Sequence, residues 1–264
     1  MATSPADYEK LLAELKGKAS GRSGVNGRVG QKSALHQTTV RNLLLAAVLT
    51  VALYFIPYAG FVTYPIRLLV TFIHEGSHAL AALLTGGMPH MMAIQPDGSG
   101  VTYTSGGWGA AISTAGYLGA TLYGAVLIAA LRRGVPGSKL MTVTGVIVGL
   151  MTVLLTRNLF GFFWGALLCV GLIAGGRKLS AEAAAWGAGF IGVQCVLNAL
   201  FDLRTLFDLT VRGSGMNDAA NMARMTWIPA PFWAGLWIVS AFVMLAFVLG
   251  PAFGAKLNLP RLRR

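Results

Sequence analysis

Residues 66–84 read IRLLVTFIHEGSHALAALL, an apolar stretch that carries two histidines and one glutamate near its middle. Its length is close to the ~20 residues that a membrane-spanning helix needs. Glu75 is the only acidic residue between Arg41 and Pro96. Because a carboxylate among apolar helical residues costs roughly 2.5 kcal/mol or more in lipid, its presence here indicates a functional site.

His74, Glu75 and His78 form an HExxH motif. Residues four apart on a helix lie on one face, about one turn from each other, so both imidazoles can reach one zinc ion. The glutamate beside the first histidine can hold or deprotonate a water at the metal. A purely structural histidine pair is the alternative, but a chance match would more often fall in a soluble, charged helix. We therefore predict His74 and His78 as zinc ligands and Glu75 as catalytic base.

The composition of the 264-residue chain is that of a polytopic membrane protein. Hydrophobic residues make up 55% and charged residues 11%, and the mean hydropathy is +0.64. The formal net charge of +12 does not indicate a nucleic-acid partner, because the basic residues cluster at the chain ends and in short turns between apolar runs. Base-stacking aromatics interleaved with Lys and Arg are absent from the sequence. The expected partners are the lipid bilayer and a membrane-protein or peptide substrate, and no oligomeric state is predicted.

Apolar segments follow one another along the chain and predict an all-α bundle of about six to seven transmembrane helices. The segments are 43–62, 66–84, 108–131, 140–156, 159–175, 183–201 and 232–250. Because both chain ends are basic, six crossings with both ends cytoplasmic are favoured, in the cell membrane. We expect a flexible basic cytoplasmic tail at 1–35, a membrane-embedded domain at 36–255 and a short basic tail at 256–264.

The stretch after the motif helix predicts a small β-hairpin. Residues 92–95 and 101–104 flank a Pro96-Asp97-Gly98 turn. Free strand edges are not tolerated in lipid unless protein or a wet cavity covers them. We therefore expect the hairpin beside the active site, where it offers an edge to which an extended peptide can pair.

A catalytic zinc needs a third protein ligand besides the two histidines. Most of the nine acids lie in the N-terminal tail, in the hairpin turn or near a helix start, which leaves Asp202, Asp208 and Asp218. Asp202 and Asp208 are flanked by Leu and Phe, so they rank slightly ahead of Asp218. Instead of binding metal, Asp218 could simply begin a helix together with Asn217. For all three aspartates, an ion pair with a nearby arginine is a further alternative to metal binding. Asn198, four before Asp202, is a candidate substrate contact, and the alternative is that its amide makes an interhelical hydrogen bond.

These motifs resemble the site-2 protease group of intramembrane zinc metallopeptidases, and most closely the B-like branch of peptidase family fifty of the metallo class. The resemblance covers roughly residues 40–250. It is carried by FIHEGSHALAALLTGG (72–87), IQPDGSGVT (94–102), and LFDL…MNDAANMARMT with the Trp-rich last helix (206–237). It implies His74 and His78 as zinc ligands, Glu75 as catalytic base, and cleavage of peptide bonds in or near transmembrane segments.

The third ligand stays open within this resemblance. The better-known site-2 proteases use the Asp of an NxxPxxxLDG pattern, whereas here Asn198 precedes the aspartates without the Pro or the following Gly. The B-like branch tends to carry an Asp in the position of Asp208 and a Ser-Asp-Ala whose Asp matches Asp218, with Asn217 replacing the Ser here. Two functions follow: a membrane zinc endopeptidase, or a catalytically inactive, metal-binding membrane scaffold or regulator of the same fold.

Overall fold

The structure is a computed structural model that describes residues 9, 45, 48–49, 59–211 and 217–249. The chain divides into two units, Met1–Arg41 and Asn42–Arg264, and the helical bundle belongs to the second. Almost all of the tail expected at 1–35, and all of the tail expected at 256–264, lie outside the described residues. Those two assignments remain predictions.

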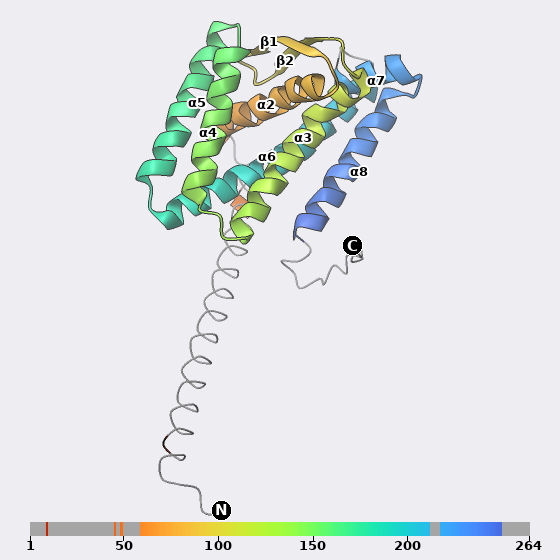
Figure 1. The fold of residues 1–264 in the computed structure, drawn as a ribbon. Coiled ribbons are helices and arrows are strands. Elements are labelled where there is room, and N and C mark those ends of the chain that lie inside the picture. Colours follow the sequence, from red (N-terminus) through yellow and green to blue (C-terminus); the bar gives the residue numbers. More distant parts are fainter. Residues whose placement is uncertain (1–8, 10–44, 46–47, 50–58, 212–216, 250–264) are drawn as a thin grey trace, which may run out of the picture. The chain divides into compact units, whose positions relative to one another are not determined.

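The described part of the chain contains seven helices and one two-stranded antiparallel sheet (Figure 1). The mostly helical architecture and the hairpin after the motif helix are therefore confirmed. The elements in chain order are α2 (Ala59–Leu84), β1 (Met88–Ile94), β2 (Gly100–Ser105), α3 (Gly109–Arg132), α4 (Gly137–Leu154), α5 (Leu159–Lys178), α6 (Ala181–Val211), α7 (Asp218–Thr226) and α8 (Ala230–Leu249).

The predicted number of six to seven spans is not confirmed. Among the described residues, α3, α4 and α5 are long and apolar enough to cross a membrane. Helices α7 and α8 meet at 119° and add a fourth span if they form one broken span or a re-entrant loop. The predicted segment at 43–62 lies mostly outside the described residues, and α2 carries Arg67 and the HExxH motif within its apolar run.

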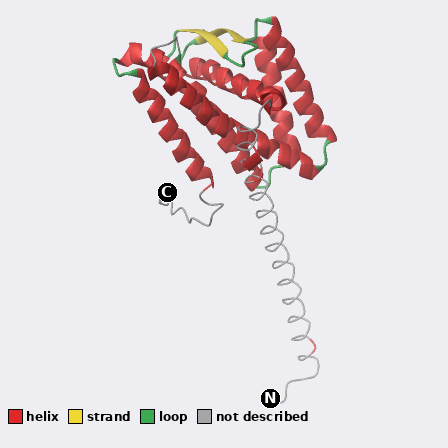
Figure 2. Cartoon of the chain, turned by 180° about the vertical axis from the view of Figure 1, so that it is seen from behind, coloured by secondary structure: helices red, strands yellow, loops and turns green. Residues whose placement is uncertain are grey.

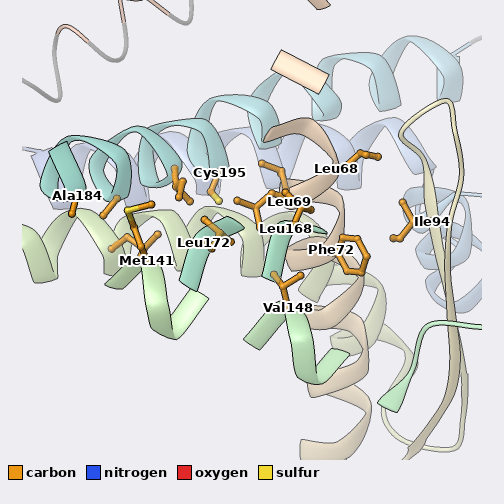
Figure 3. Close-up of a cluster of buried hydrophobic side chains, with 14 of the residues drawn as sticks. Leu68, Leu69, Phe72, Ile94, Met141, Val148, Leu168, Leu172, Ala184 and Cys195 are labelled. Carbon is orange, nitrogen blue, oxygen red and sulfur yellow. The ribbon is translucent and has the colours of Figure 1, made fainter. Parts of the chain in front are cut away.

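The motif helix α2 packs against α3, α4, α5 and α6 (Figure 1). Leu68, Leu69 and Phe72 are fully buried on one side of α2. They join a cluster that includes Val148 of α4 and Leu168 of α5 (Figure 3). In lipid such close van der Waals packing is what holds helices together. It fixes the rotation of α2 about its axis, and the histidine face of the helix is left for α3 and α7.

The loop between α4 and α5 covers the outer edge of β1. The amide of Met92 donates to the carbonyl of Leu155 (2.8 Å), and the amide of Arg157 donates to the carbonyl of Met92 (3.0 Å). The Asn158 side chain accepts from the amide of Ile94 (3.1 Å) and donates to its carbonyl (2.6 Å). Since β1 is occupied on both sides, the edge of the hairpin left free by the described residues is that of β2.

The hairpin turn is tied to α2. The Tyr64 hydroxyl donates to the carbonyl of Pro96 (2.5 Å), and the Thr71 hydroxyl donates to the carbonyl of Gly98 (2.7 Å). Within the turn, the hydroxyl and the amide of Ser99 donate to Oδ1 of Asp97 and lower the pKa of that carboxyl group. The hairpin therefore lies across the helix that carries the motif, at one end of the bundle (Figure 2).

Candidate metal centre

The two motif histidines face each other from adjacent turns of α2. Their Nε2 atoms are 3.0 Å apart, and the rings meet edge to face with centroids 4.8 Å apart. Nδ1 of His78 lies 2.6 Å from the carbonyl oxygen of Ile112 in α3. Because a carbonyl can only accept, Nδ1 carries the proton and Nε2 keeps its lone pair free for a cation.

Asp218 brings a carboxylate to the same point. Its Oδ2 lies 3.4 Å from Nε2 of His74 and 3.4 Å from Nε2 of His78. Asp218 is the first residue of α7, and the side chain of the N-cap residue Asn217 accepts from the amide of Ala220 (2.9 Å). Asn217 and Asp218 therefore do begin a helix, which is the structural role that the sequence offered as the alternative to metal binding. The aspartate nevertheless points at the imidazoles, so the helix start positions a site residue.

A glycine of α3 keeps the space beside these atoms open. A Cβ atom at Gly116 would lie 2.3 Å from Nε2 of His74 and 2.5 Å from Nε2 of His78. Tetrahedral donors about 2.0–2.2 Å from one zinc ion are about 3.3–3.6 Å from one another, and the three observed separations are 3.0, 3.4 and 3.4 Å. Two imidazoles and one carboxylate are also a known donor set of catalytic zinc. The residues present therefore fit such an ion.

Glu75 is held beside this centre by the hairpin. The side chain is 4% exposed, and its ligand atom lies within 4.8 Å of those of His74 and His78. The hydroxyl of Thr102 in β2 lies 2.6 Å from Oε2 of Glu75 and 3.1 Å from its main-chain carbonyl. The carboxylate is thus fixed next to the histidine pair without lying between the two rings.

Aromatic rings support His74 from the side of α3 and α8. The Tyr117 ring stands edge-on to His74, with centroids 4.6 Å apart at 86°. Tyr117 stacks in turn on Trp237, 5.5 Å away at 23°, and Trp237 is buried. This stack limits the rotation of the His74 ring. No pattern in the sequence predicts Tyr117, Gly116 or Thr102 as site residues, because each reaches the site through tertiary packing.

The other candidate residues of the sequence analysis lie in α6. Asp202, Asp208 and Asn198 belong to its C-terminal half, where the structure describes the backbone and not the side chains. The ranking of Asp202 and Asp208 ahead of Asp218 therefore remains a prediction. Of the three aspartates, Asp218 is the one whose carboxylate the described residues place beside the histidines.

The centre opens into a cavity of about 1050 Å³. Its walls include both histidines, Glu75 and Asp218, the β2 residues from Gly100 to Thr104, and two basic side chains, Arg67 and Arg224. A cavity of this size, lined by β2 and by His74, His78 and Asp218, can admit a segment of peptide.

The apolar helices and the His-His-Asp cluster, in which His78 is buried and His74 and Asp218 are half-buried, are features expected of a membrane-embedded metalloprotein. A match to the family described as Peptidase M50B-like covers residues 44–248, most of the chain. The chain therefore belongs to the Peptidase M50B-like family, which confirms the resemblance found in the sequence, and it is an integral membrane protein. Comparisons with curated proteins and with solved structures found no match.

Proposed function

We propose that this protein is a zinc endopeptidase that cuts peptide bonds in or near transmembrane segments of membrane proteins. The observation that carries the proposal is the convergence of three donor atoms, Nε2 of His74, Nε2 of His78 and Oδ2 of Asp218, within 3.0–3.4 Å of one another. These three residues would hold the zinc ion, with the fourth position left to water or substrate.

Glu75 is the residue that moves protons in this proposal. A zinc ion, when bound, polarises the scissile carbonyl and makes water more acidic. Glu75 takes the proton of the attacking water as the new C–O bond forms. It then delivers that proton to the leaving amine as the C–N bond breaks, so the carboxylate ends unchanged. Its position beside the histidines, on the wall of the cavity, supports a role in accepting a proton from the reacting water.

The free edge of β2 supports an extended substrate. In an antiparallel pair of strands, two residues directly opposite each other either both direct their N–H and C=O groups toward the partner strand or both direct them away from it. Met92 and Ile94 direct theirs to the α4–α5 loop, so their partners Thr102 and Gly100 direct theirs away from β1. Both residues line the cavity. We propose that a locally unwound substrate adds to this edge as a strand, which brings its carbonyl to the metal centre.

The basic N-terminal region supports a cytoplasmic N-terminus in the cell membrane. The first 42 residues contain seven Lys and Arg residues, and positively charged flanks are retained on the cytoplasmic side. An epitope tag at the N-terminus should be inaccessible to a membrane-impermeant label in intact cells. Labelling from outside would reverse the proposed orientation.

Proteolysis is tested with zinc-loaded protein in lipid vesicles that contain a set of single-span transmembrane peptides, with fragments identified by mass spectrometry. We expect cleavage by the unmodified protein and a loss of about 10²–10⁴-fold in Glu75→Gln, which still binds zinc. Full activity in Glu75→Gln would rule out the assigned base. Stoichiometric zinc with no cleaved peptide would instead favour the inactive, metal-binding scaffold.

A further inference from the structure

We propose that Thr102 is a positioning residue for the catalytic glutamate, and that Gly100 provides the space into which that glutamate is placed. The inference rests on the proposed function, since it concerns how Glu75 is prepared for proton transfer. It assigns to the hairpin a second task besides pairing with a substrate.

The contact between Thr102 and Glu75 has the features of a strong hydrogen bond. The Oγ1–Oε2 distance of 2.6 Å lies at the short end of the 2.5–3.0 Å range of O–H···O hydrogen bonds. Glu75 is buried, and a low-dielectric environment strengthens the bond further. Thr102 therefore selects one position of a side chain that has several rotatable bonds.

Gly100 limits the same carboxylate from a second direction. A Cβ atom at Gly100 would lie 2.6 Å from Cγ and 2.7 Å from Oε1 of Glu75, so any larger residue would displace the glutamate. Gly100 and Thr102 are alternate residues on one face of β2, and both are less exposed than Val101 between them. The strand therefore supplies a hydrogen bond to one oxygen and open space to the other.

The arrangement leaves Oε1 available for chemistry. Among the described residues, Oε2 accepts from Thr102, and no side chain or amide donates to Oε1. A base that holds its position through one oxygen can accept a proton on the other. A positioned general base requires this arrangement, in which Oε2 is fixed by a hydrogen bond and Oε1 is available to accept the proton.

Anchoring the hairpin does not require Thr102. Tyr64 and Thr71 of α2 already bond the hairpin turn, and Asn158 bonds β1 from the opposite side. Among the described residues, the hydroxyl of Thr102 bonds to Glu75, through Oε2 and the main-chain carbonyl. Loss of that hydroxyl should therefore affect the glutamate more than the fold.

The test compares Thr102→Val, Thr102→Ser and Gly100→Ala in the peptide-cleavage assay, with Thr152→Val as the matched control. Thr152 is a buried threonine of α4 whose hydroxyl donates to the carbonyl of Val148 in its own helix. We expect kcat to fall about 10–100-fold in Thr102→Val and Gly100→Ala, the range seen when an outer partner of a metal site is removed. In Thr102→Val, KM, zinc content and Tm should stay the same. Thr102→Ser should restore the rate, and Thr152→Val should match the unmodified protein.

A second readout does not depend on turnover. The affinity for an uncleaved transmembrane peptide, measured in the Glu75→Gln background, should not change when Thr102→Val is added. Unchanged kcat in Thr102→Val, or a loss that Thr102→Ser does not recover, overturns the positioning role while the proposed function stands. Absence of cleavage by the unmodified protein overturns both. If Thr102→Val does not fold, Gly100→Ala and Thr102→Ser decide the question.

Discussion

The two helices that supply the candidate metal centre differ in length, composition and packing. α2 is a 26-residue apolar helix that contributes His74 and His78 from the same face. α7 is a nine-residue helix with one acidic and one basic residue, and it contributes Asp218 from its first position. α2 is packed by four other helices, whereas α7 packs mainly on α3 and α8.

The two helices also differ in what places their site residues: local helix geometry places His74 and His78, whereas tertiary packing places Asp218. The spacing of His74 and His78 is set by one helical turn, so the pair exists as soon as α2 is a helix. Asp218 reaches the pair only when α7 and α8 have packed on α3, through a cluster that includes Met222 and Trp237. We therefore expect changes in α2 to remove the centre, and changes in α7 to weaken it.

The largest effect is expected for His74→Ala, which removes a donor from the rigid helix. Structural zinc sites bind with about 10–16 kcal/mol, so one of three protein ligands accounts for about 4 kcal/mol, or roughly a thousandfold in affinity. Zinc content of purified protein should fall below detection, and cleavage should cease. Zinc binding with unchanged affinity in His74→Ala would show that the zinc site does not include His74.

Asp218→Ala should weaken zinc binding by less, about a hundredfold, because water can replace one carboxylate oxygen at the metal. Asp202→Ala and Asp208→Ala serve as matched controls and also test the ranking made from sequence. Competition with a zinc chelator gives the three affinities. If Asp208→Ala or Asp202→Ala shows the larger loss, the third ligand comes from α6, and Asp218 acts as a helix start only.

The same difference explains what could be predicted from the sequence. The HExxH spacing, the hairpin around Asp97 and the helical bundle follow from local patterns, and the structure contains all three. The choice among the aspartates, and the roles of Thr102 and Gly116, depend on residues far apart in the chain. No spacing rule relates a strand threonine to a helical glutamate. The span count was not confirmed, because the predicted segment at 43–62 lies mostly outside the described residues and neither α2 nor α6 is among the helices found long and apolar enough to cross.

Gly116→Ala is expected to disturb the centre without removing a donor. Its Cβ atom would stand 2.3 Å from Nε2 of His74, so the imidazole must rotate away or α3 must move. We expect a zinc affinity about 10–100-fold lower, comparable to the loss of a partner outside the ligand set. Gly171→Ala in α5 is the control, because no atom lies within 4 Å of its added Cβ. Equal affinities in the two variants would mean that the space beside the histidines is not needed for the metal.

The smallest effect is expected for Asn217→Ala, which acts on Asp218 through the start of α7. The variant loses the hydrogen bond from the amide of Ala220 to the Asn217 side chain, and an N-cap of this kind contributes about 1 kcal/mol to helix stability. A looser first turn lets the aspartate leave the histidines more often, so zinc affinity should fall about fivefold. Asn217→Ser keeps a capping oxygen and should retain the affinity of the unmodified protein, as measured by chelator competition. A loss of equal size in both variants would mean that the Asn217 side chain does more than cap the helix. No loss in Asn217→Ala would mean that the packing of α7 on α8 alone holds Asp218 in place.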